Sequence, residues 1–115
     1  MVYRNKTKNV EMIISDGVWL GLFDEVEEYM ENDSFELQPG DVMLLYTDGI
    51  TEAWKKGAIK DQRDPEKDMF GSSRLKEVLS KSANGSPEDV RDSILDTLVD
   101  YDIYDDVTMI VIKRD

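Results

Sequence analysis

Residues 37–52 read Leu-Gln-Pro-Gly-Asp-Val-Met-Leu-Leu-Tyr-Thr-Asp-Gly-Ile-Thr-Glu, and this stretch decides the fold. Pro39-Gly40 breaks the chain ahead of an uninterrupted apolar run at residues 42–46, which has the length of a strand. An apolar run without polar alternation indicates a strand that is buried on both faces. Asp48-Gly49 ends the run with a turn signal. We therefore expect a central strand with a carboxylate at its carboxyl end.

The end of the chain holds a second strand signal with acids in front of it. Residues 107–112 are rich in β-branched side chains and follow Asp105-Asp106 directly. If strands 42–46 and 107–112 lie antiparallel, the end of the first strand meets the start of the second. Asp48 and the Asp105-Asp106 pair are then expected to converge at one rim of the sheet.

Two helices are predicted between these strands. Leucine and valine recur at helical spacing after Ser72 and Ser73, either of which can cap a helix at about 72–82. Ser86-Pro87, followed by two acids, is a strong helix start and predicts a helix at about 87–100. A short β-rich run at residues 10–14 precedes the central strand. The order predicts an α+β fold, with helices covering one face of a mainly antiparallel sheet.

Composition excludes several classes of function. The chain has 115 residues, which suits one domain, and its net charge of -12 argues against nucleic acid as the main partner. It has no Cys and no His, which excludes thiolate chemistry, Ser-His nucleophile systems and His-ligated zinc. No apolar run is long enough to span a bilayer, so we expect no membrane insertion and a cytoplasmic location. Any catalysis must use carboxylates, hydroxyls, Lys, Arg or a bound metal.

The converging acids at residues 48 and 105–106 are the strongest candidate for chemistry. Carboxylates that meet at one rim repel each other unless a cation lies between them, and Mg²⁺ or Mn²⁺ prefers such oxygen ligands. Gly49 allows the backbone to turn sharply beside this site. The alternative to a metal site is an ordinary turn and loop, because Asp-Gly is a common turn dipeptide and Asp-Asp before a strand is often a solvated loop. From spacing alone, both interpretations stay open.

Three other polar features favour a structural interpretation. Glu52 is interpreted as a surface or capping carboxylate. The polar stretch 55–68 is interpreted as a mobile surface loop, and its basic residues as solvated in preference to phosphate-binding. The acidic stretch 24–36, with seven acids and no base, is interpreted as a solvated strand pair or loop.

Several blocks of the sequence together resemble one family. Tyr46-Thr47-Asp48-Gly49-Ile50-Thr51-Glu52-Ala53, after the Pro-Gly-Asp turn, resembles the signature of the SpoIIE-type serine phosphatases, the bacterial branch of the metal-dependent (PPM) protein phosphatases. Phe70-Gly71 with Arg74-Leu75 resembles the family's next block, and Asp105-Asp106-Val107-Thr108 resembles its closing block. The resemblance covers essentially residues 1–115.

The resemblance implies a fold, a metal centre and a substrate class. The family fold is a two-sheet sandwich flanked by helices, with metal-binding carboxylates in both halves. It implies Asp48 and Asp105 as ligands of Mn²⁺ or Mg²⁺, with Asp106 as a further ligand or a neighbour of one and Gly49 shaping the turn. It also implies hydrolysis of phosphoserine or phosphothreonine on a regulatory protein, such as an anti-sigma-factor antagonist.

The chain departs from the family in length. Relatives are about twice as long, and nothing in residues 1–47 matches their earlier metal-binding blocks. We therefore expect a partial PPM-type sandwich, corresponding to the C-terminal part of the phosphatase domain and inactive by itself. The alternative is a noncatalytic pseudo-phosphatase that binds a regulatory partner. Half of a sandwich leaves an apolar sheet face uncovered, which predicts a homodimer.

Overall fold

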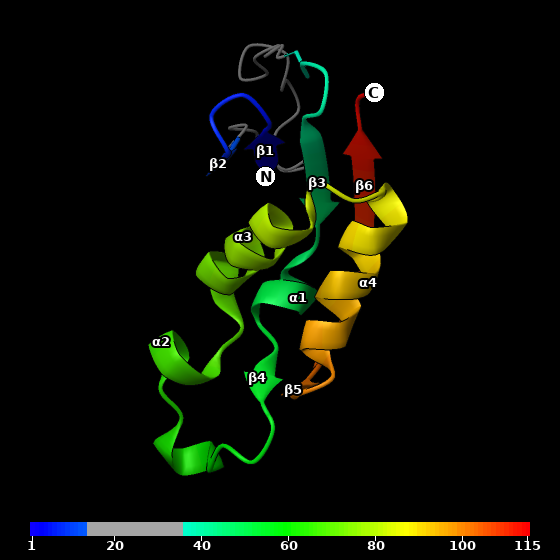
Figure 1. Ribbon diagram of the computed structural model, residues 1–115. Coiled ribbons are helices and arrows are strands. Elements are labelled where there is room, and N and C mark those ends of the chain that lie inside the picture. Colours follow the sequence, from blue (N-terminus) through cyan, green and yellow to red (C-terminus); the bar gives the residue numbers. More distant parts are fainter. Residues whose placement is uncertain (14–35) are drawn as a thin grey trace, which may run out of the picture.

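The computed structural model describes residues 1–13 and 36–115. A four-stranded antiparallel sheet forms the upper part of Figure 1 in the order β2-β1-β3-β6, and a two-stranded sheet of β4 and β5 lies below it. The strands are β1 (Val2–Arg4), β2 (Asn9–Glu11), β3 (Val42–Tyr46), β4 (Trp54–Lys55), β5 (Tyr101–Asp102) and β6 (Met109–Lys113). The helices are α1 (Asp48–Thr51), η2 (Lys60–Gln62), α2 (Pro65–Asp68), α3 (Gly71–Ser82) and α4 (Pro87–Leu98). The predicted α+β class is confirmed.

The central pairing of the sheet agrees with the sequence prediction. β3 spans the predicted residues and pairs antiparallel with β6, with Val42 opposite Lys113 and Tyr46 opposite Met109. β6 begins two residues later than predicted, at Met109. Thr108 does not extend the ladder because its backbone N–H is bound by the Thr47 side chain. The end of β3 and the residues before β6 therefore lie side by side.

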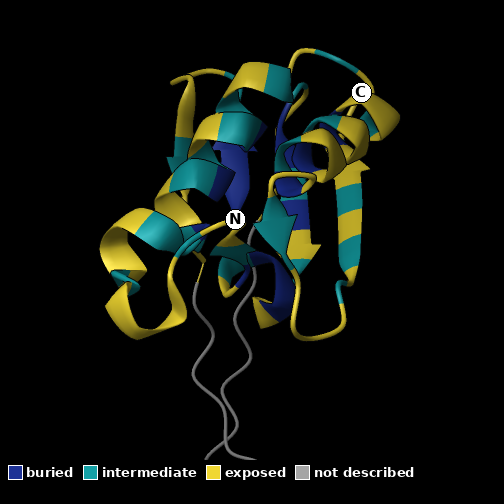
Figure 2. Ribbon diagram, turned by 90° about the horizontal axis from the view of Figure 1, so that it is seen from below, coloured by how far each residue is buried: buried dark blue, intermediate teal, exposed yellow. Residues whose placement is uncertain are grey.

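One face of the sheet forms the core with the two long helices. Tyr3, Val42 and Leu44 pack there against α3 and α4, and the dark blue strand between the helices in Figure 2 shows this layer. The helices contribute apolar residues that are fully or almost fully buried, namely Leu75, Leu79, Val90, Ile94 and Leu98. Each such side chain stabilises the fold by about 1.5–3 kcal/mol relative to an exposed position. The predicted layer of helices on one face is confirmed.

The opposite face of the sheet carries exposed apolar side chains. Leu45, Ile110 and Ile112 alternate with the core residues of β3 and β6 and are 47%, 54% and 40% exposed. Leu45 lies directly opposite Ile110, so the two form one apolar patch. The sequence led us to expect an uncovered face; these three side chains are exposed, whereas Val2, which pairs with Met43 on the same face, is buried. Dimerisation through it stays a prediction, which sedimentation at several protein concentrations would test.

A buried carboxylate anchors the start of β3 to the end of β1. Asp41 accepts hydrogen bonds from the backbone N–H groups of Asn5 and Gln38, both at 2.9 Å, and from Arg4 at 3.0 Å. Burial by itself would raise the pKa of Asp41. The two backbone N–H groups and the Arg4 guanidinium outweigh burial and hold the pKa below its usual range. Asp41 is thus an ionised structural residue of the Pro-Gly-Asp turn.

The helix starts follow the sequence in one case and not in the other. Ser86 caps α4 as predicted: its Oγ accepts from Asp89 N at 3.1 Å, and Asp89 Oδ2 accepts from Ser86 N at 2.8 Å. Neither Ser72 nor Ser73 caps α3, which begins at Gly71 after Phe70 with no side-chain cap. Tertiary packing of Phe70 fixes this start instead. The Phe70 ring is fully buried and packs edge-on against Tyr101, with 5.1 Å between the two ring centroids.

The stretch 55–68 was interpreted as a mobile surface loop, and the structure shows short regular elements within it. It contains part of β4, the 3-10 helix η2 and the short helix α2. Asp64 caps α2 by accepting from Glu66 N at 3.0 Å, and Asp68 accepts in return from Asp64 N at 2.9 Å. The predictions for residues 24–35 and for residue 14 lie outside the described residues. No helix in the described ranges is long and apolar enough to cross a membrane.

Candidate metal centre

Residues 47–49 and 105–108, which we call the strand-end junction, are joined by Thr47. Its backbone N–H donates to the carbonyl oxygen of Thr108 at 3.1 Å. Its hydroxyl donates to the carbonyl oxygen of Asp106 at 3.1 Å and accepts from the backbone N–H of Thr108, also at 3.1 Å. Thr47 therefore occupies the N-cap position of α1 without capping it. Its hydroxyl instead fixes the segment that carries Asp105 and Asp106.

Gly49 makes the closest approach in the junction. A Cβ atom at this position would lie 2.1 Å from the carbonyl oxygen of Asp106 and 3.0 Å from that of Asp105. Both contacts are with backbone, which cannot move aside as a flexible side chain can. A residue with a side chain would push the two segments apart. Gly49 is therefore required sterically, and the sequence prediction that it shapes this turn has a physical basis.

The junction presents acidic side chains of both segments to solvent. Asp48 begins α1 after Thr47, which follows β3, and Asp105 and Asp106 precede β6; all three acidic residues are exposed. The Oδ1 atom of Asp105 accepts from the backbone N–H of Asp106 at 2.8 Å, which restrains its carboxylate. Asp106 contributes its backbone carbonyl to the Thr47 contact.

The partly buried Tyr46 side chain packs against the core and lies within the electrostatic influence of the Asp48 carboxylate. Burial raises the pKa of the Tyr46 phenol, and the nearby Asp48 carboxylate raises it further. The phenol therefore stays protonated at neutral pH.

The donor set of the junction fits part of a coordination shell for a hard cation. Asp48 and Asp105 offer carboxylate oxygens, which Mg²⁺ and Mn²⁺ prefer, from two segments held in contact by Thr47 and Gly49. Within residues 1–13 and 36–115, no group of three or more acidic side chains comes close enough to hold an ion. These residues therefore fit such an ion as contributors of ligands, and they do not form a complete cage.

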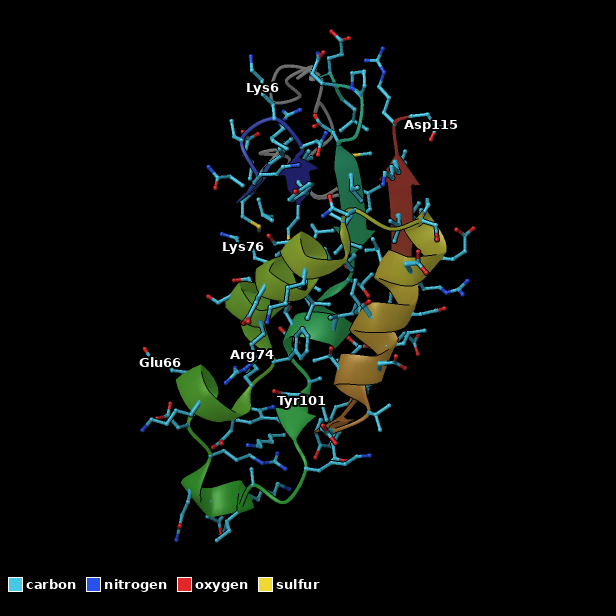
Figure 3. The ribbon with its side chains drawn as sticks, viewed as in Figure 1. Lys6, Glu66, Arg74, Lys76, Tyr101 and Asp115 are labelled. Carbon is cyan, nitrogen blue, oxygen red and sulfur yellow. The ribbon has the colours of Figure 1, made fainter. Side chains whose placement is uncertain are left out.

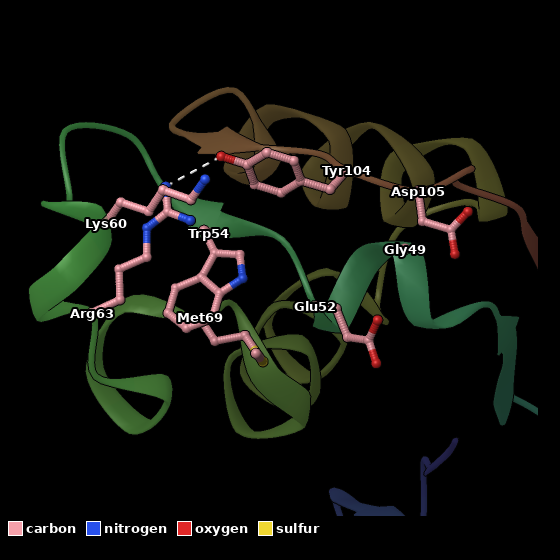
Figure 4. A pocket seen from close by; sticks show the side chains of 8 residues that line it. All are labelled: Gly49, Glu52, Trp54, Lys60, Arg63, Met69, Tyr104 and Asp105. Carbon is pink, nitrogen blue, oxygen red and sulfur yellow. Dashed lines mark hydrogen bonds between the residues drawn. The ribbon is translucent and has the colours of Figure 1, made fainter.

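A pocket of about 390 Å³ opens beside the junction. Figure 4 shows two chemically different ends. Glu52 and Asp105 lie at one end next to Gly49, and Lys60 and Arg63 lie at the other. The remaining walls are largely apolar and are formed by Trp54, Met69 and Tyr104. Glu52, which was interpreted as a surface carboxylate, is exposed and also lines this pocket.

Arg63 is held between two aromatic side chains. Its guanidinium carbon lies 5.1 Å from the centre of the Trp54 ring and 5.7 Å from that of Tyr104, within the range of cation–π contacts. One terminal nitrogen of the guanidinium donates to the Tyr104 hydroxyl at 3.2 Å. The Nε atom is buried and has no hydrogen-bond partner in the described part of the chain.

The segment that carries Trp54 and Arg63 is fastened to the rest of the fold. Trp54 pairs with Asp102 between β4 and β5 and forms a β-bridge with Met69. Arg74, in the first turns of α3, extends its side chain towards α2 (Figure 3) and donates to the carbonyl oxygens of Lys67 at 2.7 Å and Phe70 at 3.2 Å and also to Met69. Arg74 thereby closes the chain reversal after α2, which explains its place in the Phe-Gly-x-x-Arg-Leu block.

Two features of the site were not predicted from the sequence. The first is the Thr47 hydroxyl contact, although Thr47 and Thr108 each stand next to a predicted strand, which was a usable signal. The second is the cationic end of the pocket. It depends on Trp54, Arg63 and Tyr104, which are far apart in the sequence and give no local pattern.

Comparison with known proteins identifies relatives. Residues 1–115 match the family model of stage II sporulation protein E (SpoIIE). The chain is 28% identical over 112 residues to the phosphoserine phosphatase RsbU of Bacillus subtilis, which covers 97% of this chain and 31% of RsbU. It is 36% identical over 86 residues to protein IcfG of Synechocystis sp., which covers 71% of this chain and 12% of IcfG. The chain thus spans less than a third of either relative, and no solved structure matches it.

The family match extends over every block that the sequence singled out. It includes the two segments of the strand-end junction and the Phe-Gly-x-x-Arg-Leu block between them. The chain therefore belongs to the SpoIIE family, as a domain of the PPM serine phosphatase type.

Proposed function

We propose that this chain supplies part of the metal site of a serine/threonine protein phosphatase, with Asp48 and Asp105 as ligands of Mn²⁺ or Mg²⁺. The observation that carries the proposal is the strand-end junction, where Thr47 and Gly49 bring the segments of these two acids into contact. The ligands would come from different segments of a sheet edge, which holds them more precisely than a loop would. The family membership supports this chemistry.

The residues of the chain have separate roles in this proposal. Asp48 and Asp105 would hold the ions, and bound ions would supply an activated water and positive charge against the phosphoryl oxygens. Thr47 fixes the spacing between the two acidic segments. Glu52 faces the same space and adds negative charge at the rim of the pocket. Asp106 positions the junction through its backbone carbonyl.

The proposed substrate is a phosphorylated serine or threonine of a regulatory protein of the anti-sigma-factor antagonist type. One of the similar proteins is named a phosphoserine phosphatase, which favours this substrate class. An exposed rim and an open pocket suit a side chain presented by a folded protein.

A chimera tests the proposal directly. This chain would replace the matching 112 residues of RsbU, and hydrolysis of a phosphoserine peptide would be measured with Mn²⁺. We expect turnover, and we expect Asp48→Asn and Asp105→Asn each to lower it about 100-fold. Asp106→Asn is the matched control, since it removes the same charge one residue away and should change turnover only a few-fold. A folded chimera without turnover would contradict the phosphatase proposal and favour a noncatalytic partner-binding module.

We further propose that residues 1–115 do not catalyse hydrolysis by themselves. Two carboxylates on an exposed rim hold Mg²⁺ weakly, because this ion gives up its water reluctantly and needs several well-placed ligands. The test is hydrolysis of a chromogenic phosphate ester by the chain with added Mn²⁺. Turnover that disappears in Asp48→Ala would show that these ligands suffice.

A further inference from the structure

The cationic end of the pocket has no role in holding a metal. Lys60 and Arg63 line it, and in the described ranges neither forms an ion pair with an acidic side chain. The positive charges of Lys60 and Arg63 therefore line the pocket without an ion-pair partner among the described residues.

Arg63 is also prepared to bind before a ligand arrives. Trp54 and Tyr104 flank its guanidinium, and the Tyr104 hydroxyl binds one terminal nitrogen. A side chain that is already held in place loses less conformational entropy when it binds. Its Nε–H remains without a partner among the described atoms, and burial makes that costly until an acceptor arrives. An oxyanion would supply an acceptor for the donors of Arg63.

The position of this end decides which oxyanion is expected. In the proposed reaction the phosphoryl group lies at Asp48 and Asp105. Lys60 and Arg63 lie at the opposite end of the pocket, beyond the apolar walls (Figure 4). The cationic end would therefore meet a different group of the same substrate. Near a phosphoserine in a polypeptide, that group is the carboxylate of a neighbouring Asp or Glu.

The charge of the surrounding chain favours the same occupant. Residues 55–67, which we call the basic loop, hold five basic and three acidic side chains in a chain of net charge -12. An acidic substrate segment is repelled by most of this molecule and attracted here. Arginine presents a planar fork of donors that matches a carboxylate.

We propose that Lys60 and Arg63 bind a carboxylate of the substrate polypeptide next to its phosphorylated residue, with Arg63 held in place by Trp54 and Tyr104. This inference rests on the proposed function for the position of the phosphoryl group. It assigns a specificity-determining role to the basic loop and predicts a preference for phosphoserine in an acidic sequence.

Peptide binding tests this inference without turnover. Two synthetic phosphoserine peptides would be compared, Gly-Gly-Glu-pSer-Glu-Gly-Gly and the same peptide with Gln in place of both Glu residues. The chain would carry Trp19→Phe, so that Trp54 in the pocket is the single fluorescent tryptophan. Binding would be followed by Trp54 emission in the absence of metal. We expect the Glu peptide to bind about tenfold more tightly, and the difference to shrink at high salt.

Further variants of the Trp19→Phe chain separate recognition from structure. Arg63→Gln should bring the two peptides to equal affinity, and Arg63→Lys should keep part of the preference. Lys55→Gln is the matched control, because it removes the same charge from the same loop but does not line the pocket. It should keep the preference. The melting temperature of each variant checks the fold, and the Nε–H resonance of Arg63 should shift only with the Glu peptide.

Three outcomes would overturn the inference. The first is equal affinity of the two peptides for the Trp19→Phe chain, including no measurable binding of either at millimolar concentration. The second is a preference that survives Arg63→Gln and Lys60→Gln together. The third is an equal loss of both peptides in Arg63→Gln, which would place the phosphoryl group itself at this end. Failure of the phosphatase proposal is seen separately, as a folded chimera without turnover, and does not alter the peptide comparison.

Discussion

The strand-end junction and the basic loop adjoin the same pocket but are held by different forces. In the junction, Gly49 touches the carbonyl oxygens of the opposite segment, and Thr47 joins the segments by hydrogen bonds to backbone. In the basic loop, Arg63 is held by two aromatic rings and one hydroxyl. Backbone contacts at the end of a paired strand fix positions closely, whereas stacked side chains can adjust. The proposed metal ligands therefore belong to the rigid region, and the proposed substrate contact belongs to the adaptable one.

Kinetics of the RsbU chimera would show the largest difference between the two regions. Asp105→Asn should lower kcat about 100-fold, because it removes a ligand that acts on the reacting group. Arg63→Gln should raise KM for the Glu-flanked peptide about tenfold and leave kcat almost unchanged, because its contact is the same in substrate and transition state. Equal effects of both variants on kcat would contradict the division between the regions.

Glycine substitutions compare the steric tolerance of the two regions. Gly49→Ala should lower the free energy of unfolding by about 3 kcal/mol, since its Cβ would lie 2.1 Å from a backbone oxygen. Gly57→Ala in the basic loop meets no atom within 4 Å and has a backbone φ of +81°, so it should cost about 1 kcal/mol. Urea unfolding of both variants measures the difference. Similar losses would show that the junction can relax.

Asp41, at the start of β3, allows a test of how strongly the strand that leads to the junction is held in the fold. Asp41→Asn should destabilise the fold by about 2 kcal/mol at neutral pH, because it removes the charge that Arg4 and two backbone N–H groups bind. The folded-state pKa of Asp41 is lowered, so its contribution is present above the unfolded pKa of about 3.9 and is lost as pH falls through the folded pKa. Unfolding curves should therefore converge for the two proteins below about pH 4. A constant difference down to pH 2 would contradict this.

The sequence predicted the rigid region well and the adaptable region poorly, for a physical reason. The run 42–46 and the β-branched end of the chain each carry a strong local signal, and antiparallel pairing then brings the segment that carries Asp48 beside the segment that carries Asp105. Ser86 with Asp89 is likewise a local pattern. The start of α3 depends instead on burial of Phe70 against Tyr101, which is a tertiary contact. Local propensity could not show it.

The same distinction explains the pocket. Lys60 and Arg63 appear in the sequence as two bases in a polar stretch that also contains acids, which is typical of a solvated loop. Their role emerges only when β4 pairs with β5 and brings Trp54 towards the segment that carries Tyr104. Sequence alone therefore indicated the proposed metal ligands but gave no indication of the cationic end of the pocket.

The smallest predicted effect concerns how firmly the basic loop is held. Tyr104→Phe keeps the ring beside Arg63 and removes the hydroxyl that accepts its hydrogen bond, whereas Tyr104→Leu removes both contacts. We expect trypsin to cleave after Arg63 about threefold faster in the Phe variant and about tenfold faster in the Leu variant, because one contact and then two are lost. The free energy of unfolding should change little, since Tyr104 is 66% exposed. Unchanged cleavage in Tyr104→Leu would show that the backbone elements β4, η2 and α2 hold the loop without these side chains, and the two regions would then be equally rigid.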